Sequence, residues 1–143
     1  MATYYWDTSA LLTLLFQEEQ TNVLKEKLSR QGGLPGYTSF FTFVEMESGI
    51  TRRLLEGSLK PSDLTGLRLQ TQRLESHLAL IWPDEGLLTQ SRRLVMEFGL
   101  RPGDALQLAS ALLLLQEKEG ATFVCLDKKL CQAALASGLV GYW

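Results

Sequence analysis

The chain has 143 residues and a formal net charge of −2 at pH 7. That length fits one domain with its own hydrophobic core and is too short for two ordinary domains, so residues 1–143 are expected to form a single domain. The slight negative charge argues against a protein that holds nucleic acid through a globally basic surface, and any contact with RNA or DNA must be local.

The amino terminus and the cysteine content indicate a soluble, cytoplasmic protein. No basic leading segment opens the chain, and Asp7 stands where a secretory signal would need apolar residues. Cys125 and Cys131 lack the repeated pairs of a zinc ribbon, so we expect reduced, structural thiols. The longest purely apolar stretch, Ala111 to Leu115, is far shorter than the ~20 residues of a membrane span.

One strand and two helices are expected before a glycine-rich break. The aromatic residues of Ala2–Trp6 predict a strand, and the polar residues that follow suit the cap of a helix beginning around Ala10. Apolar residues at helical spacing predict a second helix over Gln20–Arg30. Glycines and a proline between Gly32 and Gly36 end that helix.

The rest of the chain alternates between short strands and helices. Helical periodicity, proline and glycine signals, and apolar runs mark each element. The expected strands are Tyr37–Ser39, Leu80–Trp82 (ended by Pro83) and Thr122–Leu126, and the expected helices are Phe40–Leu55, Pro61–His77, Asp84–Phe98 and Ala105–Gln116. Trp6 and Trp82 lie in strand-like runs and are expected in the core.

This order of elements predicts an α/β domain. No hairpin signal such as Asn-Gly separates the strands, so the central sheet should be mostly parallel, with four to five short strands between two layers of helices. In such a sheet the ligand site lies at the carboxyl ends of the strands.

Acidic residues stand where this site is expected. Asp7 and Asp127 each follow a strand, Asp104 lies in the first turn of an apolar helix, and Glu45 rides on another helix. Any one of them has a plain structural explanation as a helix cap or a partner of the helix dipole. Together, four carboxylates would repel one another unless a cation neutralised them, and all-oxygen ligation suits Mg²⁺ or Mn²⁺. The lone His77 offers no set of histidines for a softer ion.

The motifs around these acids resemble those of the PIN-domain family. The segments that carry the resemblance are Asp7-Thr8-Ser9-Ala10, Val44-Glu45-Met46, Asp104 to Ala111, and Val124-Cys125-Leu126-Asp127, and together they span nearly the whole chain. The resemblance implies a PIN-like three-layer α/β/α fold. It implies that Asp7, Glu45, Asp104 and Asp127 are catalytic, that Asp7, Asp104 and Asp127 hold the metal, and that Ser9 and Cys125 support them.

Several finer assignments accompany these acids. Glu47 is a rival to Glu45, but two residues along a helix turn the side chain by about 200°, so only one of them can face the site. Arg52 lies seven residues beyond Glu45 on the same helix face and is the best candidate for a substrate contact, with Lys128 beside Asp127 as a second. Cys125 departs from the family pattern, which has Thr or Ser at that position.

The small members of the family are commonly ribonuclease toxins of the VapBC type. The resemblance therefore implies a metal-dependent endoribonuclease that hydrolyses RNA and is the toxin of a type II toxin–antitoxin pair, with an antitoxin partner and a homodimeric state. The absence of a Ser-His-Asp set is consistent with hydrolysis by metal-activated water. The alternative is a catalytically inactive PIN-like module that binds protein or RNA.

Overall fold

A computed structural model describes residues 3–31 and 35–142. Five parallel strands form one sheet in the order β3-β2-β1-β4-β5. The strands are β1 (Tyr4–Trp6), β2 (Gly36–Ser39), β3 (Leu78–Ile81), β4 (Thr122–Val124) and β5 (Val140–Tyr142). The predicted parallel α/β sheet is confirmed. Ala2 of the first predicted strand and residues 32–34 of the glycine-rich break lie outside the described residues.

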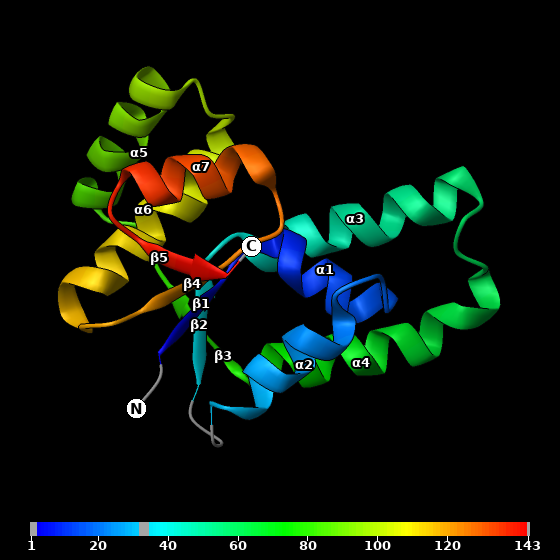
Figure 1. Ribbon diagram of the computed structural model, residues 1–143. Helices are drawn as coiled ribbons and strands as arrows, with labels where there is room; N and C mark the ends of the chain where they lie inside the picture. Colours follow the sequence, from blue (N-terminus) through cyan, green and yellow to red (C-terminus); the bar gives the residue numbers. More distant parts are fainter. Residues whose placement is uncertain (1–2, 32–34, 143) are drawn as a thin grey trace.

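Helices cover both faces of the sheet (Figure 1). They are α1 (Thr8–Phe16), α2 (Thr21–Ser29), α3 (Thr42–Glu56), α4 (Leu64–Ser76), which follows the 3₁₀ turn η1 (Pro61–Asp63), α5 (Glu85–Phe98), α6 (Pro102–Glu117) and α7 (Lys128–Ala136). Figure 1 shows α1 to α4 on one side of the sheet and α5 to α7 on the other. Among the described helices, none combines the length and the apolar character of a transmembrane segment.

Two apolar cores lie on the two faces of the sheet. Successive residues of a strand point to opposite faces, so Tyr4 and Trp6 pack with α1 to α4, whereas Tyr5 packs with α5 to α7. Trp6 is fully buried, as predicted. Because helices cover both faces, the residues of the central strand β1 are buried on both sides, and the three-layer architecture follows.

The order in which the chain adds strands to the sheet changes side at β1. After β1 it adds β2 and β3 on one side, then crosses to the other side to form β4 and β5. Trp6 pairs with Val124, so β1 and β4 end level with each other. Loops that leave two such neighbouring strands in opposite directions open a crevice at the carboxyl ends, where ligands of α/β proteins bind. Asp7 and Asp127 lie at this switch point.

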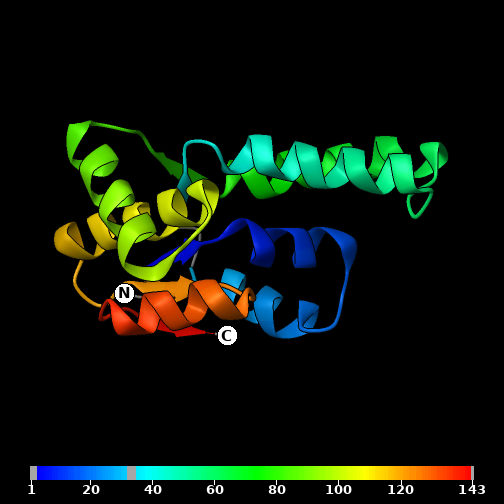
Figure 2. The same cartoon turned by 90° about the horizontal axis from the view of Figure 1, so that it is seen from above.

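Helices α3 and α4 extend away from the sheet in the same direction, as Figure 2 shows from above. Both pack on α1, and Gly49 of α3 leaves room for the Leu12 side chain of α1, because a Cβ added at Gly49 would lie only 3.0 Å from a Leu12 methyl group. The first turn of α3 thus lies at the carboxyl edge of the sheet, whereas its last turn is far from it.

Trp82 was wrongly expected in the core. Strand β3 begins at Leu78 and ends at Ile81, which pairs with Ser39, so Trp82 lies beyond the last pairing of the strand. Its side chain is 67% exposed and stacks on Phe40, with ring centroids 6.4 Å apart. The pairing register of β2 and β3 ends the strand at Ile81, although the apolar run continues to Trp82.

Helix α7 and strand β5 were not assigned from the sequence as elements. Strand β5 has three residues with a glycine between Val140 and Tyr142, and Val140 is exposed, so its pattern is too short and too irregular to predict. Both cysteines are free and buried, as expected.

Candidate functional site

Asp7 caps helix α1 and is almost fully buried, with 4% of its surface exposed. Its Oδ2 atom accepts hydrogen bonds from the backbone N–H of Ser9 at 3.1 Å and from the Ser9 hydroxyl at 2.6 Å. The Ser9 oxygen in turn accepts the backbone N–H of Leu126 at 3.0 Å. The end of β1 is therefore tied to the segment that follows β4, and Asp7 is held in one orientation.

Cys125 contacts the same carboxylate. Its Sγ atom lies 3.7 Å from Asp7 Oδ2 and 3.6 Å from the Asp127 carbonyl oxygen. The neighbouring Cys131 thiol and burial raise the pKa of the Cys125 thiol well above its usual range, so it remains a neutral, weak donor. Thr or Ser would place a stronger hydroxyl donor at this position.

Glu45 lies in the first turn of α3 and is half-buried. Its Oε1 atom accepts hydrogen bonds from the Thr8 hydroxyl at 2.7 Å and from the Gln107 side-chain amide at 2.9 Å. Glu47 instead forms an exposed ion pair with Arg68 of α4. Of the two rival glutamates, Glu45 is the one that reaches the end of β1.

Asp104 and Asp127 complete the cluster. Asp127 caps α7 by accepting the backbone N–H of Leu130 at 3.0 Å, and its side chain is exposed. Asp104 lies near the start of α6 and is half-buried. Among the described residues, no hydrogen bond or ion pair engages the Asp104 carboxylate, so helix capping does not explain this acid.

Electrostatic effects show that the four acids share one neighbourhood. Burial raises the pKa of Asp7 to about 6, the Ser9 hydrogen bonds oppose this, and Glu45 and Asp104 add to it. Burial likewise raises the pKa of Asp104, with further contributions from Asp127 and Glu45. Each acid therefore makes the ionisation of a neighbour more costly, as expected for carboxylates without a counter-ion.

The donor chemistry of this cluster suits a hard divalent cation. As they stand in the described part of the chain, no three acid, histidine or cysteine side chains are grouped closely enough to hold a metal ion. Each carboxylate nevertheless keeps at least one oxygen outside the hydrogen bonds described above. A bound cation would relieve the mutual repulsion and draw these oxygens together, and all-oxygen ligation suits Mg²⁺ or Mn²⁺.

Basic residues surround the acids unevenly. Arg101 and Lys129 lie near enough to Asp104 to oppose part of the rise in its pKa. The Lys129 ammonium also donates a hydrogen bond to the Gly99 carbonyl at 2.9 Å. Lys128 is exposed beside Asp127, at the edge of a recess that Leu126 and Leu135 also line. Arg52 is exposed on α3, seven residues or about two turns beyond Glu45. Within the described ranges it forms no hydrogen bond or ion pair.

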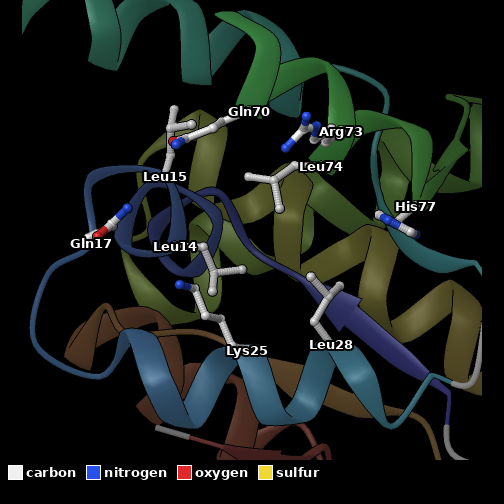
Figure 3. A pocket seen from close by; sticks show the side chains of 9 residues that line it. All are labelled: Leu14, Leu15, Gln17, Lys25, Leu28, Gln70, Arg73, Leu74 and His77. Atoms are coloured by element: carbon white, nitrogen blue, oxygen red, sulfur yellow. The ribbon is translucent and has the colours of Figure 1, made fainter. Parts of the chain in front are cut away.

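The apolar recess between α1, α2 and α4 is separate from the acids. It has a volume of about 270 Å³, and Figure 3 shows Leu14, Leu28 and Leu74 pointing into it, with His77 at one end. None of the four acids lines it. His77 is exposed.

Sequence reasoning missed the polar side chains that hold Glu45. Gln107 is 1% exposed, and its amide contacts Thr8 and Thr42 as well as Glu45. One signal was available, since Gln107 is a polar residue in a very apolar helix and lies one turn beyond Asp104. Its partners lie 62 to 102 residues away in the sequence, and no local pattern connects them.

The chain is similar to several solved structures over nearly its full length. It matches VapBC2 of Rickettsia felis with a TM-score of 0.69 and 15% identity, covering 98% of this chain and 97% of that one. It matches PAE2754 of Pyrobaculum aerophilum with a TM-score of 0.66 and 20% identity, covering 99% and 92%. For VapBC-1 of nontypeable Haemophilus influenzae, the TM-score is 0.61 and the identity 19%, covering 98% and 96%. At these identities the likeness shows the fold.

Sequence comparison gives the family. A search of curated protein sequences finds no significant match. The sequence model of the PIN domain matches residues 4–135, a range that contains all four acids and every strand except β5. The chain therefore belongs to the PIN-domain family.

Proposed function

We propose that this protein is a metal-dependent endoribonuclease that hydrolyses RNA phosphodiester bonds. The observation that carries the proposal is the position of the acidic cluster: Asp7, Glu45, Asp104 and Asp127 lie around the switch point of the sheet, where burial, and after it the neighbouring carboxylates, raises the pKa values of Asp7 and Asp104. Membership in the PIN-domain family supports nuclease chemistry.

Asp7, Asp104 and Asp127 would hold Mg²⁺ or Mn²⁺ through their oxygens. The ion would supply a water of lowered pKa and neutralise charge on the phosphate as the bond breaks. Ser9 keeps one Asp7 oxygen in place by its 2.6 Å hydrogen bond, and the other oxygen stays free for the ion. Glu45, fixed by Thr8 and Gln107, would accept a proton from the attacking water.

The substrate would reach the site along α3. Arg52 has no partner among the described residues, so its guanidinium is available for a flanking phosphate, and Lys128 could contact the strand on the other side of the acids. The net charge of −2 is consistent with this local use of a few cations. RNA contact by these two residues is part of the proposal.

We also propose that the protein is the toxin of a toxin–antitoxin pair. The structures from Rickettsia felis and Haemophilus influenzae are described as VapBC, and another similar structure is a toxin–antitoxin complex from Klebsiella pneumoniae. An antitoxin partner, a homodimeric state and a cytoplasmic location are the corresponding expectations for this chain. Two free thiols suit a reducing compartment.

A pair of helix caps tests the catalytic assignment. Asp127 caps α7 through Leu130, and Asp84 caps α5 in the same way, accepting the backbone N–H of Leu87 at 2.7 Å. Asparagine caps helices about as well as aspartate. We expect Asp127→Asn to lower the rate of RNA cleavage in Mg²⁺ or Mn²⁺ at least tenfold, and Asp84→Asn to leave it unchanged.

A chelator completes the experiment. EDTA should abolish cleavage by the parent protein, and added Mn²⁺ should restore it. If purified parent protein cleaves no RNA from a mixed structured pool with either ion, or if both asparagine variants cleave at the parent rate, the catalytic proposal is wrong. The inactive module that binds protein or RNA would then be the better account.

A further inference from the structure

Gln107 joins three elements of the acidic site through one buried amide. Its Oε1 atom accepts the Tyr5 hydroxyl at 2.6 Å. Its Nε2 atom lies 2.9 Å from each of three oxygens, those of the Thr8 hydroxyl, the Thr42 hydroxyl and Glu45 Oε1. An amide with 1% of its surface exposed and both ends engaged is a fixed point of the structure.

The orientation of this amide follows from counting protons. The Trp6 carbonyl can only accept, so the Thr38 hydroxyl, 2.7 Å away, gives its proton there. The Thr42 hydroxyl lies 2.7 Å from Thr38 and must then donate to it, which leaves the Thr42 oxygen to accept from Gln107. With the Tyr5 proton directed to the other end, the amide nitrogen faces Glu45 and cannot be flipped without loss of hydrogen bonds.

Two donor groups, the Gln107 amide and the Thr8 hydroxyl, thereby face Glu45 Oε1, and the two protons of Nε2 are shared among Glu45, Thr8 and Thr42. The second glutamate oxygen points toward Gly103, where an added Cβ would lie 3.0 Å from it. Gly103 directly precedes Asp104, and Asp104 stands one helical turn before Gln107. Gln107 and Asp104 share helix α6, so the amide of Gln107 fixes where the Glu45 carboxylate of α3 lies relative to Asp104.

We propose that Gln107 is a positioning residue of the nuclease site, acting through Glu45. This inference rests on the proposed function, in which Glu45 accepts a proton during RNA hydrolysis. Gln107 itself touches neither substrate nor ion. Its amide holds the Glu45 carboxylate in one rotamer, because Gln107 and Thr8 both lie against the same oxygen, Oε1.

Three variants separate positioning from packing. Gln107→Met keeps the length of the side chain and removes its donors and acceptor. Gln107→Glu is isosteric and keeps an oxygen for Tyr5, but it turns a second oxygen toward Glu45. Tyr5→Phe removes only the hydroxyl that orients the amide. Leu114→Ala, at a buried position near the far end of α6, is the control for a loss of stability that leaves the network intact.

The kinetic readout is kcat and KM for a labelled RNA at saturating Mn²⁺, measured well below the melting temperature of each variant. We expect Gln107→Met and Gln107→Glu to lower kcat about tenfold to a hundredfold with KM within twofold of the parent, and Tyr5→Phe to have a smaller effect in the same direction. Leu114→Ala should keep the kcat of the parent. Gln107→Met should add little to Glu45→Gln, because a residue that acts only through Glu45 has no further effect once the glutamate carboxylate is gone.

The side-chain amide protons of Gln107 give a second readout that needs no activity. In nitrogen–proton NMR spectra they should exchange slowly with water, and Glu45→Gln should shift both signals. Unchanged kcat in Gln107→Met, or a full multiplication of the two effects in the double variant, would overturn the inference. If the parent cleaves no RNA, the proposed function fails. Separately, the positioning claim is wrong if the Gln107 amide protons exchange rapidly with water and their signals do not shift in Glu45→Gln.

Discussion

The hydroxyl of Ser9 donates to Asp7 Oδ2 over 2.6 Å, and the Ser9 hydroxyl oxygen itself accepts the backbone N–H of Leu126 over 3.0 Å. One small side chain thus joins the ends of β1 and β4, the two strands that flank the switch point of the sheet. The segment after β4 carries Asp127, so Ser9 couples the positions of two acids that are 120 residues apart in the sequence.

Ser9→Ala should impair both activity and stability. The Leu126 N–H would lose its partner, and a hydrogen bond to a carboxylate would disappear, so we expect a loss of about 1–3 kcal/mol in the free energy of unfolding. The rate of RNA cleavage should fall about tenfold. Ser137→Ala, which removes a hydroxyl bonded only to the Ala133 carbonyl, is the control in denaturant unfolding and in the cleavage assay. Equal behaviour of the two variants would contradict a special role for Ser9.

Asp7→Asn should stabilise the protein at neutral pH. Asp7 has an ordinary pKa of 3.8, which rises to about 6 in the folded chain, so between these values the folded state binds the proton and the unfolded state does not. The free energy of unfolding therefore falls as the pH rises through this window. The total decrease is on the order of 3 kcal/mol and is complete above pH 6. Asparagine removes this penalty.

The measurement is urea unfolding of the parent and of Asp7→Asn at pH 4 and pH 7 in the presence of a chelator. The difference in stability between the two proteins should be larger at pH 7. A difference that is the same at both pH values would contradict the raised pKa. Added Mn²⁺ should stabilise the parent at pH 7 much more than the variant, because the cation replaces the missing counter-charge.

Gly103 provides room for Glu45 beside Asp104. A Cβ at this position would lie 3.0 Å from Glu45 Oε2 and 3.5 Å from the Phe41 ring, so Gly103→Ala should displace the glutamate and lower cleavage about tenfold or more. Gly66 of α4 has open space around its Cα, and Gly66→Ala should instead stabilise the helix by about 0.5–1 kcal/mol with normal activity. Cleavage rates and thermal melts of both variants check this. Full activity of Gly103→Ala would refute it.

Arg52 and Arg53 are adjacent but should have different functions. Arg53 pairs with Glu18 at 2.5 Å, and its guanidinium lies 3.9 Å from the centre of the Phe16 ring, so Arg53→Ala should mainly reduce stability. Arg52→Ala should raise KM for RNA severalfold, leave kcat and stability nearly unchanged, and reduce the dependence of KM on salt concentration. Steady-state kinetics at two salt concentrations distinguish them. An unchanged KM in Arg52→Ala would remove this residue from the substrate path.

The sequence predicted the acids because each belongs to a local pattern. Asp7 and Asp127 directly follow apolar runs, and parallel strands bring such positions to one edge of a sheet. The rotation of about 100° per residue in a helix allows only one of Glu45 and Glu47 to face the site, and the choice of Glu45 followed from the family resemblance, in which an apolar residue, here Met46, directly follows the acid. The predicted mostly parallel sheet of four to five strands is confirmed, because alternating strand and helix patterns leave few possible topologies.

Other features depend on contacts that no local pattern encodes. Gln107 reaches Thr8, Thr42 and Glu45 only because α6 packs beside α3 and the end of β1. Trp82 is exposed, although it was expected in the core, because β3 begins at Leu78, two residues before the predicted start of the strand, and ends at Ile81. The pKa of Asp7 depends on its burial and on the nearby carboxylates of Glu45 and Asp104, and no local sequence pattern places these groups around it.

Asp104 offers the most direct test of the acidic cluster as a metal-dependent nuclease centre. In the described chain its carboxylate forms no hydrogen bond or ion pair, so Asp104→Asn removes a charge without breaking a structural contact. The measurement is the initial rate of cleavage of a labelled RNA, titrated with Mn²⁺, for the parent and this variant. We predict a parent rate that rises to saturation with Mn²⁺ and is abolished by EDTA, and a variant rate at least a hundredfold lower with the same thermal stability or a higher one. Equal rates in the two proteins, or parent cleavage that ignores Mn²⁺ and EDTA, would contradict the account.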